Sequence, residues 1–555
     1  MSNSERRDNS LRAALVAILL GVVASRTDMT AQTFPERFVL DSTISHRINI
    51  ADTTPPYEIF EKITNAPHIL TREAVTRRTA NDVLRRVDTV TRLTLDEYEA
   101  ALRDLEIFST ISFDYRGEQL SPRIPVPTGT LITTTEDGWS LLAEPYEEPA
   151  DDRTIWALVE KNVAGQAKQI LIGGDLYSPG DSTWRGIARY IDPQLFGRTL
   201  RLESFLLWSR PRWDLTLGVE RPLYTRMVPT VYGGTLFVRN GEDLFRFGSG
   251  VDNQIVDTTI ATHVKAHGWF GSTNRKEDVF VASGSLLVDH HEHHEGIAHP
   301  RPFENTFGVF AGIRSIRRTY RHVRGFGFTG DHLVPLGAAG GVSIGKFFGL
   351  NGGDDDHIVL AVDARQTFMT GDLYTFLSVA VGTGLKQRQT ELTTLRIEGA
   401  AGLPVGPGAL VSAADLEIVW RWRRYLWSSA TQGYLGLRGY DDVDVVGANH
   451  LRLNTEYRLF PLVPLFLWEG GVTLFHDIAG YWDQGVPFSD VRFHNAAGLG
   501  LRIGSSRTID AGFLRIDFAW NFDRNEFGGI SFDFTEAFDL FGTLDYRPPG
   551  PVVPQ

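Results

Sequence analysis

Apolar and polar residues alternate one by one along much of the chain between about residue 165 and residue 545. In the clearest segment Leu451, Leu453, Tyr457 and Leu459 alternate with Arg452, Asn454, Glu456 and Arg458. The same alternation runs through Leu416–Arg423 and Leu514–Asn521 and returns in Ile530, Phe532 and Phe534. A period of two is the pattern of a β-strand with one apolar and one polar face. Glycine, proline, asparagine and aspartate clusters separate these segments, so the pattern predicts many short strands.

The length of these segments distinguishes between two kinds of β-protein. Several run for about 8–10 residues, close to what a tilted strand needs to cross a bilayer. Aromatic residues also gather near strand ends, where membrane barrels carry interfacial girdles; they are Trp420, Trp422, Tyr425, Trp427, Trp468, Tyr481 and Trp482. A soluble sandwich would alternate as well and is the alternative. We expect residues 151–545 to form an antiparallel transmembrane β-barrel of roughly 16 strands, an even number as is usual for such barrels.

Residues 32–150 show a mixed pattern and predict a small α+β domain. The expected order is β-α-α-β-β: a strand at Tyr57–Ile63, a helix capped by Thr71, a second helix opened by the capping box Thr94–Glu97, and strands at Ile107–Tyr115 and Trp139–Ala143. The second helix places Leu95, Tyr98, Leu102 and Leu105 on one face. An acidic segment, Glu147–Asp152, reads as the linker to the barrel.

The N-terminus has the pattern of a secretory signal. Arg6, Arg7 and Arg12 precede the apolar run Ala13–Ala24, and small residues follow. The run is shorter than the roughly 20 residues of a membrane-spanning helix. We therefore expect residues 1–31 to be a signal peptide, with cleavage after Ala24 or Ala31.

Composition excludes some functions. The formal net charge of −13 argues against a nucleic-acid partner. The chain has no cysteine, so it forms no disulfide and carries no thiolate chemistry. Neither a phosphate-binding glycine loop nor an H-E-x-x-H motif occurs. We expect a protein without a cofactor that is not an enzyme.

One histidine-rich segment carries the ligand types of a transition-metal site, namely His290, His291, His293 and His294. Consecutive histidines in a strand would point to opposite faces, and no second motif completes a site. The segment is therefore a weak metal candidate, and we expect a solvated hairpin loop there.

Several segments of the barrel region resemble the BamA-type outer-membrane superfamily, which includes TamA, two-partner secretion transporters such as FhaC, and bacterial surface antigens. Gly436–Tyr440 is similar to its (V/L)-R-G-(F/Y) motif, and Phe475–Trp482 to its F-x-D-x-G segment on a late strand. Segments similar to later strands (Gly498–Arg502, Leu514–Ala519), to the aromatic C-terminal assembly signal (Phe532, Phe534, Phe538) and to the first barrel strands (residues 192–224) also occur.

The resemblance implies a long extracellular loop that folds back into the lumen with the arginine motif at its tip. The residues concerned are Leu437, Arg438, Gly439 and Tyr440, with Asp477 and Gly480 on the facing strand. Apart from the resemblance, a guanidinium inside a lumen needs a fixed anion, and a carboxylate can meet its rigid fork with two parallel hydrogen bonds. We expect Arg438 and Asp477 to pair and to pin the loop.

The N-terminal domain resembles a POTRA domain, with Leu102–Phe108 as its helix-to-strand junction. The family usually carries several such domains, whereas one fits here, and a tail from Asp539 follows the presumed last strand, with residues 546–555 outside the barrel. The resemblance implies an outer-membrane factor that assembles, inserts or translocates proteins, with its N-terminal domain in the periplasm. Its partners would be the lipid bilayer, unfolded outer-membrane or secreted clients, and periplasmic proteins or lipoproteins. The alternatives are a two-partner-secretion pore for one exported protein, a barrel enzyme such as a lipase, and a surface antigen without a transport role.

Overall fold

The computed structural model describes most of the chain from residue 34 onward. The described residues are 34–49, 68–118, 126–147, 154–175, 185–210, 212–247, 255–296, 305–326, 332–350, 356–387, 389–422, 428–429, 436–440, 446–465, 468–504, 513–533, 538, 540–542, 544 and 547. The expected signal peptide, residues 1–31, and the expected strand Tyr57–Ile63 lie outside them. Among the described residues, no helix is both long and apolar enough to cross a membrane.

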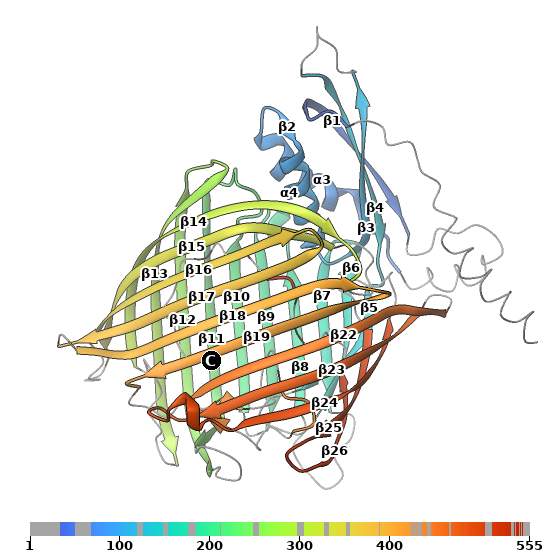
Figure 1. Ribbon diagram of the computed structural model, residues 1–555. Coiled ribbons are helices and arrows are strands. Elements are labelled where there is room, and N and C mark those ends of the chain that lie inside the picture. The colour runs from blue at the N-terminus through green and yellow to red at the C-terminus, as the bar shows by residue number, and fades with distance from the viewer. Residues whose placement is uncertain are drawn as a thin grey trace, which may run out of the picture.

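The chain begins with a small α+β domain that sits at one end of a large barrel (Figure 1). Its elements are β1 (Arg37–Ile48), α3 (Glu73–Val83), a 3-10 turn (Leu84–Arg86), β2 (Val90–Thr91), α4 (Arg92–Arg103), β3 (Phe108–Gly117) and β4 (Thr128–Asp137). They form a four-stranded sheet in the order β2-β1-β4-β3, in which β1 and β4 run parallel. Apart from the two-residue β2, the described elements come in the order β-α-α-β-β, but the first strand is β1, which was not expected from the sequence, and the expected first strand lies outside the described residues.

The helix face expected from the sequence forms the core of this domain. Leu95, Tyr98, Leu102 and Leu105 are buried, and they pack in one cluster with Phe38 of β1. The boundaries differ from those expected. The N-cap of helix α4 is Thr91, three residues before the start of the expected capping box, and its side chain accepts from the Thr94 amide.

Two other expectations about the small domain were wrong. Thr71 does not cap α3; its hydroxyl and its amide both donate to Asp137 of β4 instead. The last strand of the domain is β4, not Trp139–Ala143, because residues from Leu141 already belong to the barrel. The parallel pairing of β4 with β1 depends on partners 89 residues apart at Val39 and Thr128, which local periodicity does not reveal.

The barrel is a closed antiparallel sheet of 20 strands within the described residues. They are β5 (Leu141–Glu147), β6 (Thr154–Val163), β7 (Lys168–Gly174), β8 (Arg185–Asp192), β9 (Arg201–Ser209), β10 (Arg212–Arg221), β11 (Thr230–Phe247), β12 (Ile255–Thr273), β13 (Asp278–Glu295), β14 (Thr306–Val323), β15 (His332–Gly349), β16 (His357–Thr370), β17 (Leu373–Lys386), β18 (Gln389–Val405), β19 (Gly408–Trp420), β22 (Asn449–Leu465), β23 (Trp468–Trp482), β24 (Phe493–Gly504), β25 (Phe513–Asn521) and β26 (Glu526–Asp533). Two further short strands, β20 (Ser428–Ser429) and β21 (Val446–Gly447), pair with each other. The order is sequential, and β26 lies next to β5, which closes the sheet.

The expected count of about 16 strands was too low, and the expected boundary at residues 150/151 was too late. The first six strands, β5 to β10, are compressed into residues 141–221, where short connections leave far fewer residues per strand than the average assumed from the sequence. The expected position falls between β5 and β6, which are both strands of the barrel, so the barrel already begins at Leu141. The segment 192–224 therefore contains the end of the fourth strand and the fifth and sixth strands, not the first ones.

The two faces of the barrel wall have the polarity of a membrane barrel. On β16 the exposed side chains are Ile358, Leu360 and Val362, whereas Asp363 faces the interior and accepts from Arg314 at 2.6 Å. In water the exposed face would be the polar one. An apolar outside and a charged inside are what a lipid-embedded barrel with a polar lumen requires. The expected transmembrane β-barrel is confirmed.

The expected aromatic girdle is only partly present. Trp420 is exposed, but Trp422, Tyr481 and Trp482 are buried. Trp422 donates from its indole nitrogen to the carbonyl oxygen of Thr393. Tyr425 and Trp427 lie outside the described residues. Adjacent aromatic residues at a strand end cannot all face lipid, because successive side chains point to opposite faces.

The small domain docks onto one mouth of the barrel, here called the domain-side mouth. The connections after β6, β8 and β10 all contact it: Asn162 donates to Thr71, Gln194 to Thr79, and Thr225 to Glu97. Because neighbouring strands are antiparallel, the connections after β14, β16, β18 and β22 and the end of β26 lie at this same mouth. The connection between β19 and β22, which carries the arginine motif, starts from the opposite end.

Candidate functional site in the barrel lumen

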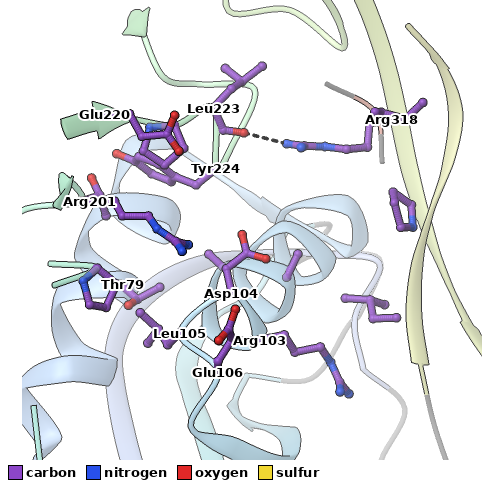
Figure 2. Close-up of a pocket in the computed structure, with 18 of the residues that line it drawn as sticks. Thr79, Arg103, Asp104, Leu105, Glu106, Arg201, Glu220, Leu223, Tyr224 and Arg318 are labelled. Atoms are coloured by element: carbon purple, nitrogen blue, oxygen red, sulfur yellow. Dashed lines mark hydrogen bonds between the residues drawn. The ribbon is translucent and has the colours of Figure 1, made fainter. Parts of the chain in front are cut away.

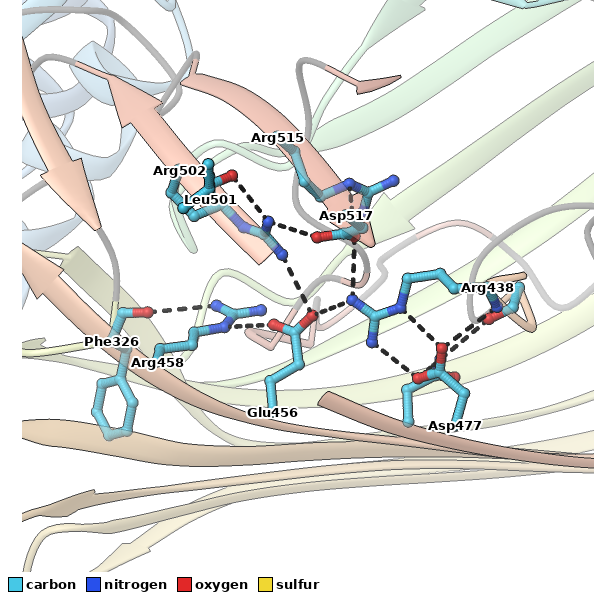
Figure 3. Close-up of polar contacts among 11 residues, drawn as sticks. Phe326, Arg438, Glu456, Arg458, Asp477, Leu501, Arg502, Arg515 and Asp517 are labelled. Carbon is cyan, nitrogen blue, oxygen red and sulfur yellow. Dashed lines mark hydrogen bonds and ion pairs between the residues drawn. The ribbon is translucent and has the colours of Figure 1, made fainter. Parts of the chain in front are cut away.

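The arginine motif lies against the inner wall of the barrel (Figure 3). Leu437 is 1% exposed and packs with Tyr440 against Ala479, Tyr481 and Ala496. The motif belongs to the connection between β19 and β22, of which residues 436–440 are described. Because this connection leaves the barrel at the end opposite the small domain, its contact with β23 and β24 means that it folds back into the lumen.

Arg438 is held by three carboxylates from three different strands. Its Nε and Nη2 each donate to an oxygen of Asp477 on β23, both at 2.7 Å. Its Nη1 donates to Glu456 on β22 at 2.7 Å and to Asp517 on β25 at 3.2 Å. The guanidinium also lies over the Phe475 ring, 3.6 Å from its centroid, in a cation–π contact. All five donors of a guanidinium lie in one plane, so this arrangement selects arginine over lysine.

The carboxylates around Arg438 are almost wholly removed from solvent. The side chains of Glu456 and Asp517 are 0% exposed and that of Asp477 is 1% exposed. Such charges are tolerated in a protein interior only when they are paired and hydrogen-bonded. The cluster therefore has to be assembled as a unit.

Two of the three carboxylates have other arginine partners. Glu456 accepts from Arg458 at 2.8 Å, and Asp517 accepts from Arg502 at 2.6 Å. Asp477 differs, since its further contact is with the neutral amide of Asn454 at 2.7 Å. Of the three acids, Asp477 thus depends most on Arg438 for charge compensation.

The backbone of the motif is fixed independently of the arginine side chain. Asn454 also donates to the carbonyl oxygen of Gly436, and Asn521 donates to that of Gly439. Gly439 has φ +83°, a left-handed conformation that other residues rarely adopt. A methyl group added there would also lie 2.8 Å from the Cβ of Ala519. The glycine is therefore required both for the turn and for the close approach to β25.

The structure brings together some of the residues singled out in the sequence and separates others. Gly480 lies on β23 opposite Phe493, where an added methyl group would meet Phe493 and Val491, and it is not in the ion cluster. Phe532 lies on β26, whereas Phe534 lies outside the described residues. Phe538 is not on the last strand, which ends at Asp533; it is buried inside the barrel.

The histidine-rich segment was wrongly expected to be a solvated hairpin loop. It belongs to β13, and His291 is 3% exposed while His294 faces out. His291 and His293 lie on the same face with Nδ1 and Nε2 3.0 Å apart, next to His263 of β12. Across the part of the chain that the structure describes, no group of three or more histidine, aspartate or glutamate side chains is arranged to hold a metal ion.

Sequence reasoning missed Glu456, Asp517, Arg458 and Arg502 as members of the site. The signal was present, because each is a charged residue on the lumen-facing side of an alternating strand. The alternation does not reveal the register of strand pairing, and it is this register that places the charged side chains of four strands at the same height in the barrel.

A second feature lies where the small domain meets the barrel rim. A cavity of about 550 Å³ is lined by the end of α4, by the connection between β10 and β11, and by the end of β14 and the start of β15 (Figure 2). Arg103 and Asp104 line it from the domain, and Arg201 and Arg318 from the barrel. Leu544 and Arg547, from beyond the last strand, line it too. The cavity is thus the unfilled part of the domain-side mouth.

Comparison with known proteins gave solved structures only. No family model matches the chain, and no curated protein does. The chain is similar to the crystal structure of BamA from Haemophilus ducreyi lacking POTRA domains 1–3, at 10% identity over 89% of this chain and 83% of that chain, with a TM-score of 0.38. It is also similar to CdiB from Acinetobacter baumannii (9% identity, 90% and 73% covered, TM-score 0.39) and CdiB from Escherichia coli (11% identity, 92% of each covered, TM-score 0.30). At TM-scores below 0.5 these likenesses carry no argument about function.

Proposed function

We propose that this protein is an outer-membrane barrel that inserts polypeptides into the membrane or translocates them across it, without covalent catalysis. The observation that supports the proposal is the unequal length of the strands around the barrel. Strands β11 to β15 have 18 or 19 residues, whereas β5 and β26, which meet where the sheet closes, have 7 and 8. A strand needs about 9–11 residues to cross a bilayer. The closure between β5 and β26 is therefore a short seam.

The composition of the two seam strands weakens the seam further. Pro145 on β5 has no backbone N–H to donate, and β26 contains Gly528 and Gly529. Few hydrogen bonds then have to break for the sheet to open sideways into the lipid. A client strand could pair with the exposed edge, since main-chain hydrogen bonds provide affinity without requiring a particular sequence.

The small domain is placed to deliver such a client. It docks at the domain-side mouth, and within the described residues β3 pairs with β4 alone, which leaves the other edge of β3 open. An extended chain can add to that edge as a further strand. The sequence resemblance of this domain to POTRA domains, and of the arginine motif to BamA-type barrels, supports the same role. We place the domain in the periplasm, with unfolded outer-membrane or secreted proteins as clients and periplasmic proteins or lipoproteins as partners.

The proposal is tested by depletion of the protein followed by a census of the outer-membrane proteome. Loss of many barrels supports insertion, and loss of one secreted protein supports a dedicated secretion pore. An unchanged proteome and secretome would reject both and would leave the barrel enzyme or the surface antigen.

A crosslink across the seam separates insertion from passage through the lumen. The chain has no cysteine, so one introduced on β5 and one on β26 form a unique pair. Closing the seam should stop insertion through it but not transport along the lumen. The matched control joins Leu158 and Ile172, which already face each other across β6 and β7.

A further inference from the structure

Three of the described residues beyond the last barrel strand, Phe538, Leu540 and Leu544, are buried inside the barrel or its mouth rather than lying outside it. β26 ends at Asp533 at the domain-side mouth, and Phe538 and Leu540 are then 1% and 4% exposed. They pack with lumen-facing side chains of five strands, namely Val323, Val334, Tyr374, Ala400, Ala409, Val411 and Ala413. The segment 538–547 is here called the strap, of which residues 538, 540–542, 544 and 547 are described.

The middle of the strap is fitted to an aromatic cradle. The Phe541 ring packs against Phe326, His332 and Tyr374 at centroid distances of 6.0, 5.0 and 5.2 Å. The backbone amide of Gly542 donates to the Tyr374 hydroxyl at 3.0 Å. A methyl group at Gly542 would overlap the Phe376 ring, so only glycine fits at this point.

The end of the strap reaches the other side of the mouth. Leu544 is buried in the cluster that joins the small domain to the barrel, together with Leu223 and Trp269. Arg547 forms an ion pair with Glu220 at the end of β10, with its Nη2 3.0 and 3.2 Å from the two carboxylate oxygens. The strap therefore runs from the β22 wall across the domain-side mouth to β10, and its end lines the cavity there.

The strap is also joined to the arginine cluster. The Arg458 guanidinium lies over the Phe538 ring, 5.1 Å from its centroid, and the same group donates to Glu456 and to the carbonyl oxygen of Phe326. Glu456 in turn accepts from Arg438. A displacement of the strap would change the surroundings of Arg458 and through it those of the pinned loop.

We propose that the strap is a built-in gate that occupies a peptide-binding cradle at the domain-side mouth, and that its release opens the lumen. An extended polypeptide with aromatic side chains could make the same contacts: it could pack on the aromatic rings, donate to the Tyr374 hydroxyl and pair with the partly exposed Glu220 carboxylate. The strap is tethered at β26, and its outer anchor is a partly exposed ion pair, which solvent screens and weakens. A competing chain would therefore meet a weak barrier at Arg547 and a stronger one at Phe541. The strap would act as a gate whichever polypeptide the protein inserts or translocates.

The test is ion conductance of the purified full-length protein in a planar bilayer. Gly542→Ala should expel the middle of the strap and raise the ratio of open to closed time roughly tenfold, equivalent to ~1.4 kcal/mol. Gly268→Ala is the matched control, because a methyl group there meets no atom within 4 Å, and it should conduct as the wild type does. The shift in gel mobility on boiling verifies that each barrel is closed.

Two further arms keep the test decisive. Glu220→Cys and Arg547→Cys, joined by a short thiol crosslinker, should hold the channel closed. In the Gly542→Ala background the same crosslink should suppress the opening only in part, because the middle of the strap at Phe541 stays untethered. A synthetic peptide of residues 534–547 added to the Gly542→Ala variant should lower its conductance, whereas the same peptide with Phe538 and Phe541 replaced by alanine should not. Equal conductance of wild type, Gly542→Ala and crosslinked protein, with no effect of the peptide, would overturn the proposal.

Discussion

Arg438 and Asp477, 39 positions apart in the chain, meet inside the barrel through two parallel hydrogen bonds of 2.7 Å each. Arg438 stands on a connection that starts from the end of the barrel opposite the small domain, and Asp477 stands on β23 of the wall. Their side chains are 8% and 1% exposed. The pair therefore holds the inner loop to the wall in an environment from which water is largely excluded.

Breaking this pair should cost more than breaking any other contact of Arg438. Arg438→Ala and Asp477→Ala should each destabilise the loop by about 3–5 kcal/mol, since each leaves a buried charge without its partner. The double variant should be little worse than either single one. The measurement is a double-mutant cycle on urea unfolding, followed by gel mobility.

The matched cycle pairs Arg438→Ala with Glu456→Gln. Its coupling should be smaller, because Glu456 also accepts from Arg458. Arg438→Lys should rescue only partly, because an ammonium cannot meet three carboxylates through a planar fork. Simple addition of the Arg438 and Asp477 effects would contradict a direct contact between them.

Gly439→Ala should displace the inner loop. The substitution imposes a left-handed backbone on alanine, at roughly 1–2 kcal/mol, and in addition places a methyl group against Ala519. Gly485→Ala is the control, since Gly485 has φ +86° but no atom within 4 Å of the added methyl. Protease accessibility of the inner loop should rise in Gly439→Ala only; equal accessibility in both variants would mean that the fit of Gly439 against β25 does not hold the loop.

The docking of the small domain should weaken at acid pH through Glu99. Burial raises the pKa of Glu99, but the hydrogen bond from His322 and the charge and hydrogen bond of Arg103 outweigh it and hold the pKa below its usual value. A lowered folded-state pKa stabilises the protein fully above the unfolded-state pKa, and this contribution is lost as the pH falls through the lowered value. The unfolding temperature of the wild type should therefore fall on acidification below the usual glutamate pKa of about 4.3.

Glu99→Gln should remove this part of the acid sensitivity. Burial raises the pKa of the neighbouring Asp96, so the difference between wild type and Glu99→Gln, rather than either curve alone, isolates Glu99. Glu73→Gln is the control, because the Glu73–Arg77 pair is more than half exposed. An identical pH dependence of wild type and Glu99→Gln would mean that the contact with His322 does not hold the domain to the barrel.

The mature protein should fractionate with the outer membrane and should migrate differently on gels before and after boiling. The reason is the apolar outer face, which exposes Ile358, Leu360 and Val362 on one strand alone and requires a lipid environment. Recovery from the soluble periplasm, with no change of mobility on heating, would exclude a membrane barrel.

The alternation of Leu451, Leu453 and Tyr457 with Arg452, Asn454 and Glu456 was sufficient to predict a membrane barrel with a charged lumen, because the direction of a side chain in a strand depends only on its position in the alternation. The Arg438–Asp477 contact was predicted from the resemblance of both segments to family motifs, together with the need of a guanidinium inside a lumen for a fixed carboxylate. The alternation therefore follows from local geometry, whereas the choice of Asp477 as partner came from the resemblance.

Only the tertiary structure decided the features that depend on the register of strand pairing and on the closure of the sheet. It placed Glu456 and Asp517 at the height of Arg438, put His291 on a lumen face instead of in a loop, and divided the wall into 20 strands, of which the short β5 and β26 meet at the seam. It also showed that Phe538, which was expected to belong to the assembly signal, is a buried residue of the strap. The physical reason is that a shift of one residue in strand pairing leaves the sequence pattern unchanged but moves every side chain to the other face.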